Sequence, residues 1–351
     1  MGKILRLLTA LFIAICFLKG PSMAQNQNLD HGYYAKIQTD GLAWSLRVND
    51  LYVRENGNFG YETSDGNIGM QLQPGRNTVS LLFSPLTGET AENGDFIFEL
   101  RDGLLIDISI QRIDYATRES REINCVTLRY DMTRNDFVAE DKTAAGMDRV
   151  MVQPSLRTDG KFTISDLPPR SIVFKTGETI GGYRLDFMIE VDDEELPPFH
   201  WREEDAVQLE DSPATRKELM QAYQRLHDLI ARGDKATILR EARPVWERTA
   251  FILTSDASSA EEFVGNTELG LDMFNQRHPD GSELQDLRMK TGIESAALQF
   301  MDGGRLVRIR PDPIIWALPP GSSKDITSVF PVVFYKSESG EWRIAEINVG
   351  L

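Results

Sequence analysis

Residues 96–111 read Phe-Ile-Phe-Glu-Leu-Arg-Asp-Gly-Leu-Leu-Ile-Asp-Ile-Ser-Ile-Gln, and this stretch decides the fold class of the first half of the chain. Apolar side chains recur at every second position on both sides of Asp102-Gly103, which is the period of a strand with one buried face. An Asp-Gly pair readily adopts the two positive φ values of a type I′ turn. The stretch therefore predicts two antiparallel strands joined as a hairpin.

Runs with the same period lie before and after this stretch. They occur at 42–48, 79–83, 126–130, 162–164, 172–174 and 183–191, separated by segments rich in Gly, Pro and Asp. Several short antiparallel strands, each with one wet face, are typical of a β-sandwich. The turn at 72–77 resembles the turn that opens a strand in many accessory β-sandwich modules. We therefore expect residues 25–195 to form an antiparallel β-sandwich domain.

The N-terminus has the pattern of a secretory signal peptide. Lys3 and Arg6 precede the apolar run 7–18, and small residues follow at 22–24. The run is shorter than the ~20 residues that cross a bilayer as a helix. We expect residues 1–24 to be cleaved off after Ala24, which leaves a periplasmic or secreted protein with no stable membrane insertion.

The mature chain is strongly acidic. The leader holds three of the 38 Lys and Arg and none of the 54 Asp and Glu, so 35 basic and 54 acidic side chains remain, a net charge of −19. Phosphate contacts need clustered Lys and Arg, so we expect no nucleic-acid partner. A basic protein partner fits this charge, and so does plain solubility. Only Cys125 survives cleavage, so packing rather than an intrachain disulfide must stabilise the fold.

An acidic, proline-bearing segment follows the predicted sandwich. We expect residues 196–212 to be a solvated linker, because the acids around it lack the spacing and the glycine of an EF-hand calcium loop. Within it, Trp201 is expected to pack one domain on the other rather than to bind sugar. The absence of any Asn-x-Ser/Thr sequon favours a bacterial periplasm.

The second half begins with helices. Ser212 suits an N-cap and Pro213 the first helical position, and an apolar face at helical spacing follows, made by Leu219, Tyr223, Leu226 and Ile230. Gly233 can close this helix, and Asp234 can cap a second one that is bent or interrupted at Pro244. A third helix is expected over 261–274.

After Thr291 the pattern returns to strands, at 297–300, 306–309, 314–318, 329–335 and 342–349. In the last of these, Trp342 and Ile344 share one face whereas Ala345, Ile347 and Val349 share the other, which predicts a β-bulge. Pro331 predicts an edge or a bulge in the preceding strand.

This order of elements, with the segment 231–234 after a long helix and a final Gly-Glu-Trp-Arg-Ile-Ala at 340–345, resembles the nuclear-transport-factor-like superfamily. The resemblance covers about residues 213–351. It implies an α+β cone, in which helices pack on a curved antiparallel sheet, with a pocket between them. Enzymes, ligand binders and interaction modules all use that pocket, so the fold alone does not choose a function. The expected fold class is therefore multidomain, a β-sandwich plus this α+β domain.

No motif for catalysis is present. The four histidines lie far apart in the sequence, at positions 31, 200, 227 and 278, and none has metal-ligand spacing. A nucleophile elbow, a phosphate-binding loop and a dinucleotide fingerprint are also missing from the sequence. We therefore assign no catalytic residue, no metal site and no cofactor.

Aromatic residues give the one candidate pocket, which a small apolar ligand could fill. Its residues would be Trp246, Phe251, Phe300, Trp316 and Phe334, with His227 as a base or as a residue bordering the core. The alternative interpretation is that these aromatic residues are the core of the domain.

The leading hypothesis is an exported, non-catalytic binding or adaptor protein, for example an immunity-type protein that masks a basic effector. An enzyme or small-ligand binder that uses the pocket is the second. A carbohydrate- or envelope-binding module that uses exposed aromatics such as Trp44 or Tyr52 is the third.

Overall fold

A computed structural model describes residues 29–347, except residues 58, 91, 93–95, 141–160, 164–170, 175, 195, 254–275, 278–280, 293–295 and 323–325. The predicted leader and the predicted helix over 261–274 lie outside the described residues. Every strand pairing in the described part is antiparallel. Strands outnumber helices, so the expectation of a chain built mostly from antiparallel sheets is confirmed.

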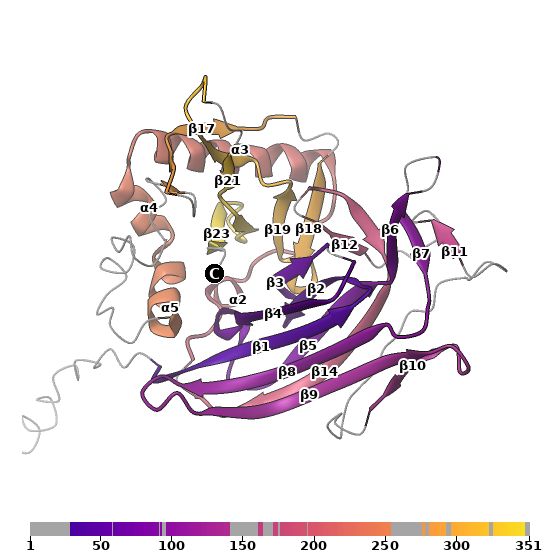
Figure 1. Cartoon of the computed structure of the whole chain (residues 1–351). Coiled ribbons are helices and arrows are strands. Elements are labelled where there is room, and N and C mark those ends of the chain that lie inside the picture. The colour runs from indigo at the N-terminus through magenta and orange to yellow at the C-terminus, as the bar shows by residue number, and fades with distance from the viewer. Residues whose placement is uncertain are drawn as a thin grey trace, which may run out of the picture.

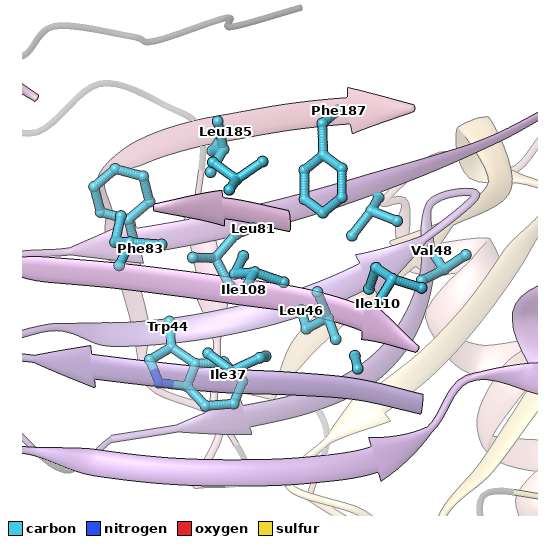
Figure 2. Packing of buried hydrophobic residues seen from close by; sticks show 14 of the residues in the cluster. Ile37, Trp44, Leu46, Val48, Leu81, Phe83, Ile108, Ile110, Leu185 and Phe187 are labelled. Carbon is cyan, nitrogen blue, oxygen red and sulfur yellow. The ribbon is translucent and has the colours of Figure 1, made fainter. Parts of the chain in front are cut away.

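Two sheets dominate the first half (Figure 1). The five-stranded sheet has the order β10 (Asp136–Ala139), β9 (Ser120–Asp131), β8 (Leu105–Asp114), β1 (His31–Asp40), β4 (Glu62–Asn67). The four-stranded sheet has the order β14 (Tyr183–Val191), β5 (Gly75–Ser84), β2 (Ala43–Val48), β3 (Leu51–Asn56). Their inward side chains belong to one apolar core, shown in Figure 2. Ile108 and Ile110 from one sheet and Leu81 and Phe187 from the other are 0 % exposed in it.

The two runs around Asp102-Gly103 are strands, but the prediction that they pair as a hairpin is wrong. The first run forms β7 (Phe96–Glu99), which pairs with β6 (Leu86–Thr90) and β11 (Lys161–Thr163), whereas β8 pairs with β1 and β9. A type I′ turn needs positive φ at both central residues. Of this pair Gly103 alone has one, at 84°. The chain therefore leaves one sheet here and enters another.

A short two-stranded sheet, β12 (Ser171–Val173) with β13 (Thr179–Gly181), completes the first half.

The segment 196–212 carries helix α2 (His200–Glu203). The expectation that this whole segment is solvated was wrong. Phe199, Trp201 and Ala206 are buried in a cluster with residues of both halves, which confirms that Trp201 packs one half on the other.

The helix boundaries predicted near Ser212, Gly233, Asp234 and Pro244 are confirmed. Helix α3 (Pro213–Ala231) begins after Ser212, whose side chain accepts a hydrogen bond from the backbone N–H of Thr215. Gly233 follows its end with a φ of 67°. Helix α4 (Lys235–Glu241) is capped by Asp234, and the helix is interrupted before Pro244, where α5 (Arg243–Leu253) begins.

The helices pack on one face of a four-stranded sheet. Its order is β18 (Ala297–Met301), β19 (Leu306–Arg310), β22 (Val332–Lys336), β23 (Trp342–Ile347). Leu219, Tyr223 and Trp246 from the helices share a core with Val307 and Phe334 from this sheet. Smaller sheets lie beside it, namely β17 (Asp286–Met289), β20 (Ile314–Ala317) and β21 (Thr327–Val329) in one, and β15 (Gln276–Arg277) with β16 (Glu283–Leu284) in another.

Two irregularities predicted from the sequence are present. The predicted strand 329–335 is divided at Pro331, so that β21 and β22 belong to different sheets, because proline cannot donate to a ladder. In β23, Phe334 pairs with Ile344 but Val333 pairs with Glu346. Ala345 is therefore the extra residue of a bulge, which confirms the slip read from the apolar pattern.

The second face of the four-stranded sheet packs against the first half. Leu306, Val333 and Tyr335 share a buried cluster with Leu51 and Tyr52 of β3. We call this contact the seam. The indole N–H of Trp201 donates to Asp302 Oδ2 over 3.0 Å.

Buried charges cross the seam. The Arg310 guanidinium lies 2.8 Å from Glu55 Oε2 and 3.1 Å from Asp312 Oδ2, and all three side chains are 5 % exposed or less. The Arg308 guanidinium stacks on the Tyr52 ring, 4.1 Å from its centroid. Charges removed from water are costly unless each is paired. The seam therefore holds the two halves in one defined arrangement.

The side chain of Arg248 helps to anchor helix α5 to the first half. The Arg248 guanidinium donates to the backbone carbonyl oxygens of Met70, Leu72 and Pro197, and it lies 4.6 Å from the centroid of the Phe199 ring. Burial lowers the pKa of Arg248 to about 10, so it remains a cation at neutral pH.

We expect Arg310→Met to lower the free energy of unfolding by about 3–5 kcal/mol, because it removes the guanidinium that two buried carboxylates bind. Chemical denaturation measures this. The control is Arg129→Met, whose ion pair with Glu140 has side chains 52 % and 37 % exposed; it is expected to cost less than about 1 kcal/mol. Equal losses in the two variants would mean that the charges of the seam do not hold it.

Candidate functional site

A cleft of about 770 Å³ lies beside strand β23. Helix α3, the junction of α4 and α5, and the β22–β23 hairpin form its walls, and α2 borders it through His200 and Glu204. The amphipathic pattern of α3 places it there, since the helix turns Tyr223 into the core and leaves Glu218, Gln221 and Arg225 beside the hairpin. We call this the β23 cleft.

The floor of the β23 cleft is apolar. Leu226 and Leu229 of α3, Phe334 of β22 and Ile344 of β23 line it, and each is less than 9 % exposed. Phe334 is held by an edge-to-face contact with Tyr223, with 4.8 Å between ring centroids. The floor is therefore a rigid extension of the helix–sheet core.

The first charged group on the walls is Glu218. Its carboxylate accepts a hydrogen bond from Lys336 Nζ at 2.6 Å and from the indole N–H of Trp342 at 3.0 Å. These two donors hold the pKa of the Glu218 carboxyl below its ordinary value. Glu218 is therefore an anion at neutral pH and fixes the Trp342 ring at the rim.

The second charged group centres on Glu204 and Arg343. Arg343 donates to Glu204 over 2.5 Å and to Glu341 over 2.9 Å, and the Tyr335 hydroxyl donates to Glu204 over 2.5 Å. Burial and the bond to Glu204 raise the pKa of Tyr335. A third pair, Arg225 with Glu241 at 2.5 Å, faces them from the helices.

His200 is the one imidazole in the cleft. Its Nε2 lies 3.2 Å from the carbonyl oxygen of Ile344, and burial lowers the pKa of His200. The ring is therefore neutral at pH 7, and its Nε2 carries the proton because a carbonyl can only accept. Among the described residues no carboxylate is hydrogen-bonded to this ring, so no His–carboxylate dyad is present there.

These contacts define what the cleft can do. Its four carboxylates, at 204, 218, 241 and 341, each pair with a cation. A general acid at neutral pH needs a raised carboxyl pKa, and that of Glu218 is lowered. An apolar floor with paired charges on its walls is suited to holding a ligand.

The predicted pocket residues are dispersed. Trp246, Trp316 and Phe334 are buried in the helix–sheet core, and Phe300 packs on its margin. Phe251 packs instead against the core of the first half. His227 is half-buried, with Nδ1 3.2 Å from Asp228 Oδ1. Of the six, Phe334 alone lines the β23 cleft.

The aromatic residues proposed for carbohydrate binding are not exposed. Trp44 is 0 % exposed, with its indole N–H bonded to Thr39 Oγ1, and Tyr52 is 5 % exposed beneath Arg308. The expectation that these two side chains are exposed was wrong. For Trp44 the reason is that the alternation that makes 42–48 a strand also turns this side chain inward.

Sequence reasoning missed the charged wall of the cleft. Glu204 lies in the segment 196–212, which was expected to be solvated, and no role was predicted for Glu218 or Arg343. A signal was present in the final hairpin, where the charged residues Lys336 and Arg343 flank Trp342 near the turn. The sequence does not reveal that α2 and α3 bring carboxylates to them.

Two features are absent from the described residues. No helix among them combines the length and the apolar character needed to cross a bilayer. In the same ranges, no three His, Cys, Asp or Glu side chains are grouped so that they could hold a metal ion.

Comparison with known proteins gives no relative. No family model, no curated protein and no solved structure matches this chain. The case for a function therefore depends on the geometry of the chain itself.

A buried carboxyl lies on the other side of β23. Glu346 is 5 % exposed and lies near the charges of Arg248, Arg308 and Asp302, which also belong to the second half. Burial raises the pKa of Glu346 to about 7, although the two guanidinium groups favour its ionised form. Because the folded pKa lies above the unfolded value of about 4.3, the folded state binds this proton more tightly. The resulting stability is present at pH 4 and is lost as the pH rises through 7.

We expect Glu346→Gln to remove that part of the pH dependence. Between pH 4 and pH 8 the free energy of unfolding of the unaltered protein should fall, relative to that of the variant, by about 3 kcal/mol. Denaturant titration at pH 4, 6 and 8 measures the difference. The surface variant Glu247→Gln, whose carboxylate is 58 % exposed, should keep the unaltered profile, and parallel profiles for all three proteins would contradict the argument.

Proposed function

We propose that this chain is an exported, non-catalytic binding protein of the bacterial periplasm or envelope, and that the β23 cleft is its ligand site. The observation that carries the proposal is the pairing of every wall carboxylate around an apolar floor. A partner that covers this floor gains hydrophobic free energy of about 25 cal/mol per Å² of apolar surface. The paired charges then supply orientation rather than chemistry.

The proposed architecture is a β-sandwich over 25–195 joined to an α+β cone over 213–351. The two-sheet core of the first half and the packing of α3, α4 and α5 on a bulged antiparallel sheet support it. The nuclear-transport-factor-like resemblance belongs to the same proposal. The leader and the mature charge of −19 support export and a basic protein partner, for which an immunity-type or adaptor role is the concrete form.

A small-ligand site or an enzyme is the second candidate. The neutral ring of His200 in the β23 cleft favours it, because its unprotonated nitrogen could accept a proton. Against it, the ring lacks an orienting carboxylate among the described residues. Under this alternative a small molecule, rather than a protein, would saturate the cleft.

We expect Gln221→Trp to abolish partner binding, because Gln221 is exposed and lines the cleft, so that an indole there fills it. Immobilised mature protein is exposed to an envelope fraction of the source organism, and bound protein is quantified. Recovery of the specific partner should fall by at least about tenfold.

The matched control is Gln224→Trp, an exposed position on the same helix outside the cleft. It should retain the partner, and both variants should unfold with the same midpoint. Equal recovery on Gln221→Trp and on Gln224→Trp would overturn the assignment of the cleft as the binding site.

A further inference from the structure

Strand β23 has one unpaired edge. It pairs with β22 on one side, and no strand in the described ranges pairs with the other. An unpaired edge presents backbone N–H and C=O groups that can accept a further strand. The β23 cleft adjoins this edge, because Trp342, Arg343 and Ile344 all line it.

The hairpin register identifies the groups that face outward. Ser337 N–H donates to the Glu341 carbonyl, so this pair is hydrogen-bonded. Antiparallel pairs alternate between hydrogen-bonded and non-hydrogen-bonded. The pairs Lys336 with Trp342 and Phe334 with Ile344 are therefore non-hydrogen-bonded. The backbone groups of Trp342 and Ile344 point away from β22, towards the free edge.

The contact of His200 agrees with this assignment. Its Nε2 donates to the Ile344 carbonyl, which it could not reach if that carbonyl faced β22. His200 thus covers one of the four outward groups. The Trp342 N–H and C=O and the Ile344 N–H have no hydrogen-bond partner among the described residues.

The two faces of β23 differ at this edge. Ile344 and Trp342 lie on the helix side, where Ile344 belongs to the apolar core and Trp342 packs against it. Arg343 and Glu341 are on the opposite face, and Glu341 is 65 % exposed there. Residues directly opposite each other in neighbouring strands share a face. An added strand therefore meets an apolar surface at two alternate positions and a carboxylate at the position opposite Glu341.

We propose that the partner binds by adding an extended segment to the free edge of β23, antiparallel to it. From its N-terminus, the segment has an apolar residue opposite Ile344 and a neutral residue opposite Arg343. A second apolar residue then lies opposite Trp342, and a basic residue lies opposite Glu341. This inference rests on the proposed function, since it names how the same cleft is filled. The basic position agrees with the net charge of −19 for the mature chain.

The test uses a labelled peptide, acetyl-Thr-Val-Thr-Val-Lys-Thr-amide, and fluorescence anisotropy with the full mature chain. A second peptide is N-methylated at the valine that precedes lysine, whose N–H would donate to the Trp342 carbonyl. The matched control is N-methylated at the threonine between the valines, whose N–H would point away from β23. We expect the first methylation to weaken binding at least tenfold and the control to change it less than threefold.

Two substitutions test the register. His200→Ala uncovers the Ile344 carbonyl and should tighten peptide binding severalfold. Glu341→Lys should reverse the preference between the lysine peptide and its glutamate counterpart. The unaltered protein should prefer lysine, and no preference in either protein would overturn the register.

The outcomes separate this inference from the proposed function. If both methylated peptides bind as the plain peptide does, and Gln221→Trp excludes all three, the cleft is a binding site but strand addition is wrong. If no peptide binds, addition to β23 is wrong, and the capture experiment with Gln221→Trp and Gln224→Trp decides the proposed function on its own.

Discussion

The burial of both faces of one four-stranded sheet is the constraint on which the rest of the structure depends. Helices α3, α4 and α5 cover one face with apolar side chains. The other face meets β3 of the first half, and there Arg310 pairs with Glu55 and Asp312. Such a cluster is weak evidence for net stability, because desolvation offsets the Coulomb attraction. The cluster nevertheless fixes how the two halves are arranged, since any shift of one half against the other would separate the buried charges.

That constraint limits where a partner can bind. With both faces of the sheet covered, its remaining accessible backbone is at the edges, and β23 is the edge that adjoins the cleft. The cleft walls are fixed by ion pairs among α2, α3 and the hairpin, as Glu204 with Arg343 shows. A ligand would therefore meet a preorganised surface, which reduces the entropy lost on binding.

Local signals predicted local structure well, because each has a mechanism confined to a few residues. Ser212, Gly233 and Asp234 set helix ends through single hydrogen bonds or one positive φ, and the slip in 342–349 gave the bulge. Strand β1 was missed, although Tyr33, Ala35 and Ile37 alternate inward. The hairpin predicted at Asp102-Gly103 was wrong, because a turn signal does not determine which strands pair with each other.

The candidate site was less predictable for a physical reason. Large aromatic residues fill a helix–sheet interface as readily as they line a pocket, and the sequence period is the same in both cases. Trp246 and Trp316 were therefore equally compatible with either role. The cleft depends instead on charges from residues up to 139 positions apart, as between Glu204 and Arg343. No pattern within one element contains that information.

The bulge in β23 allows this one strand to contribute to the seam, to the helix-side core and to the cleft. In a regular strand Trp342, Ile344 and Glu346 would share a face, which would turn the Glu346 carboxyl into the helix-side core. The extra residue, Ala345, shifts the phase, so that Glu346 shares the face of Val333 and lies near Arg248 and Arg308, while Ile347 joins the helix-side core. The residues before the bulge keep their alternation, and the backbone groups of Trp342 and Ile344 stay directed at the free edge. One inserted residue thus lets the same strand close the seam, complete the core and border the cleft.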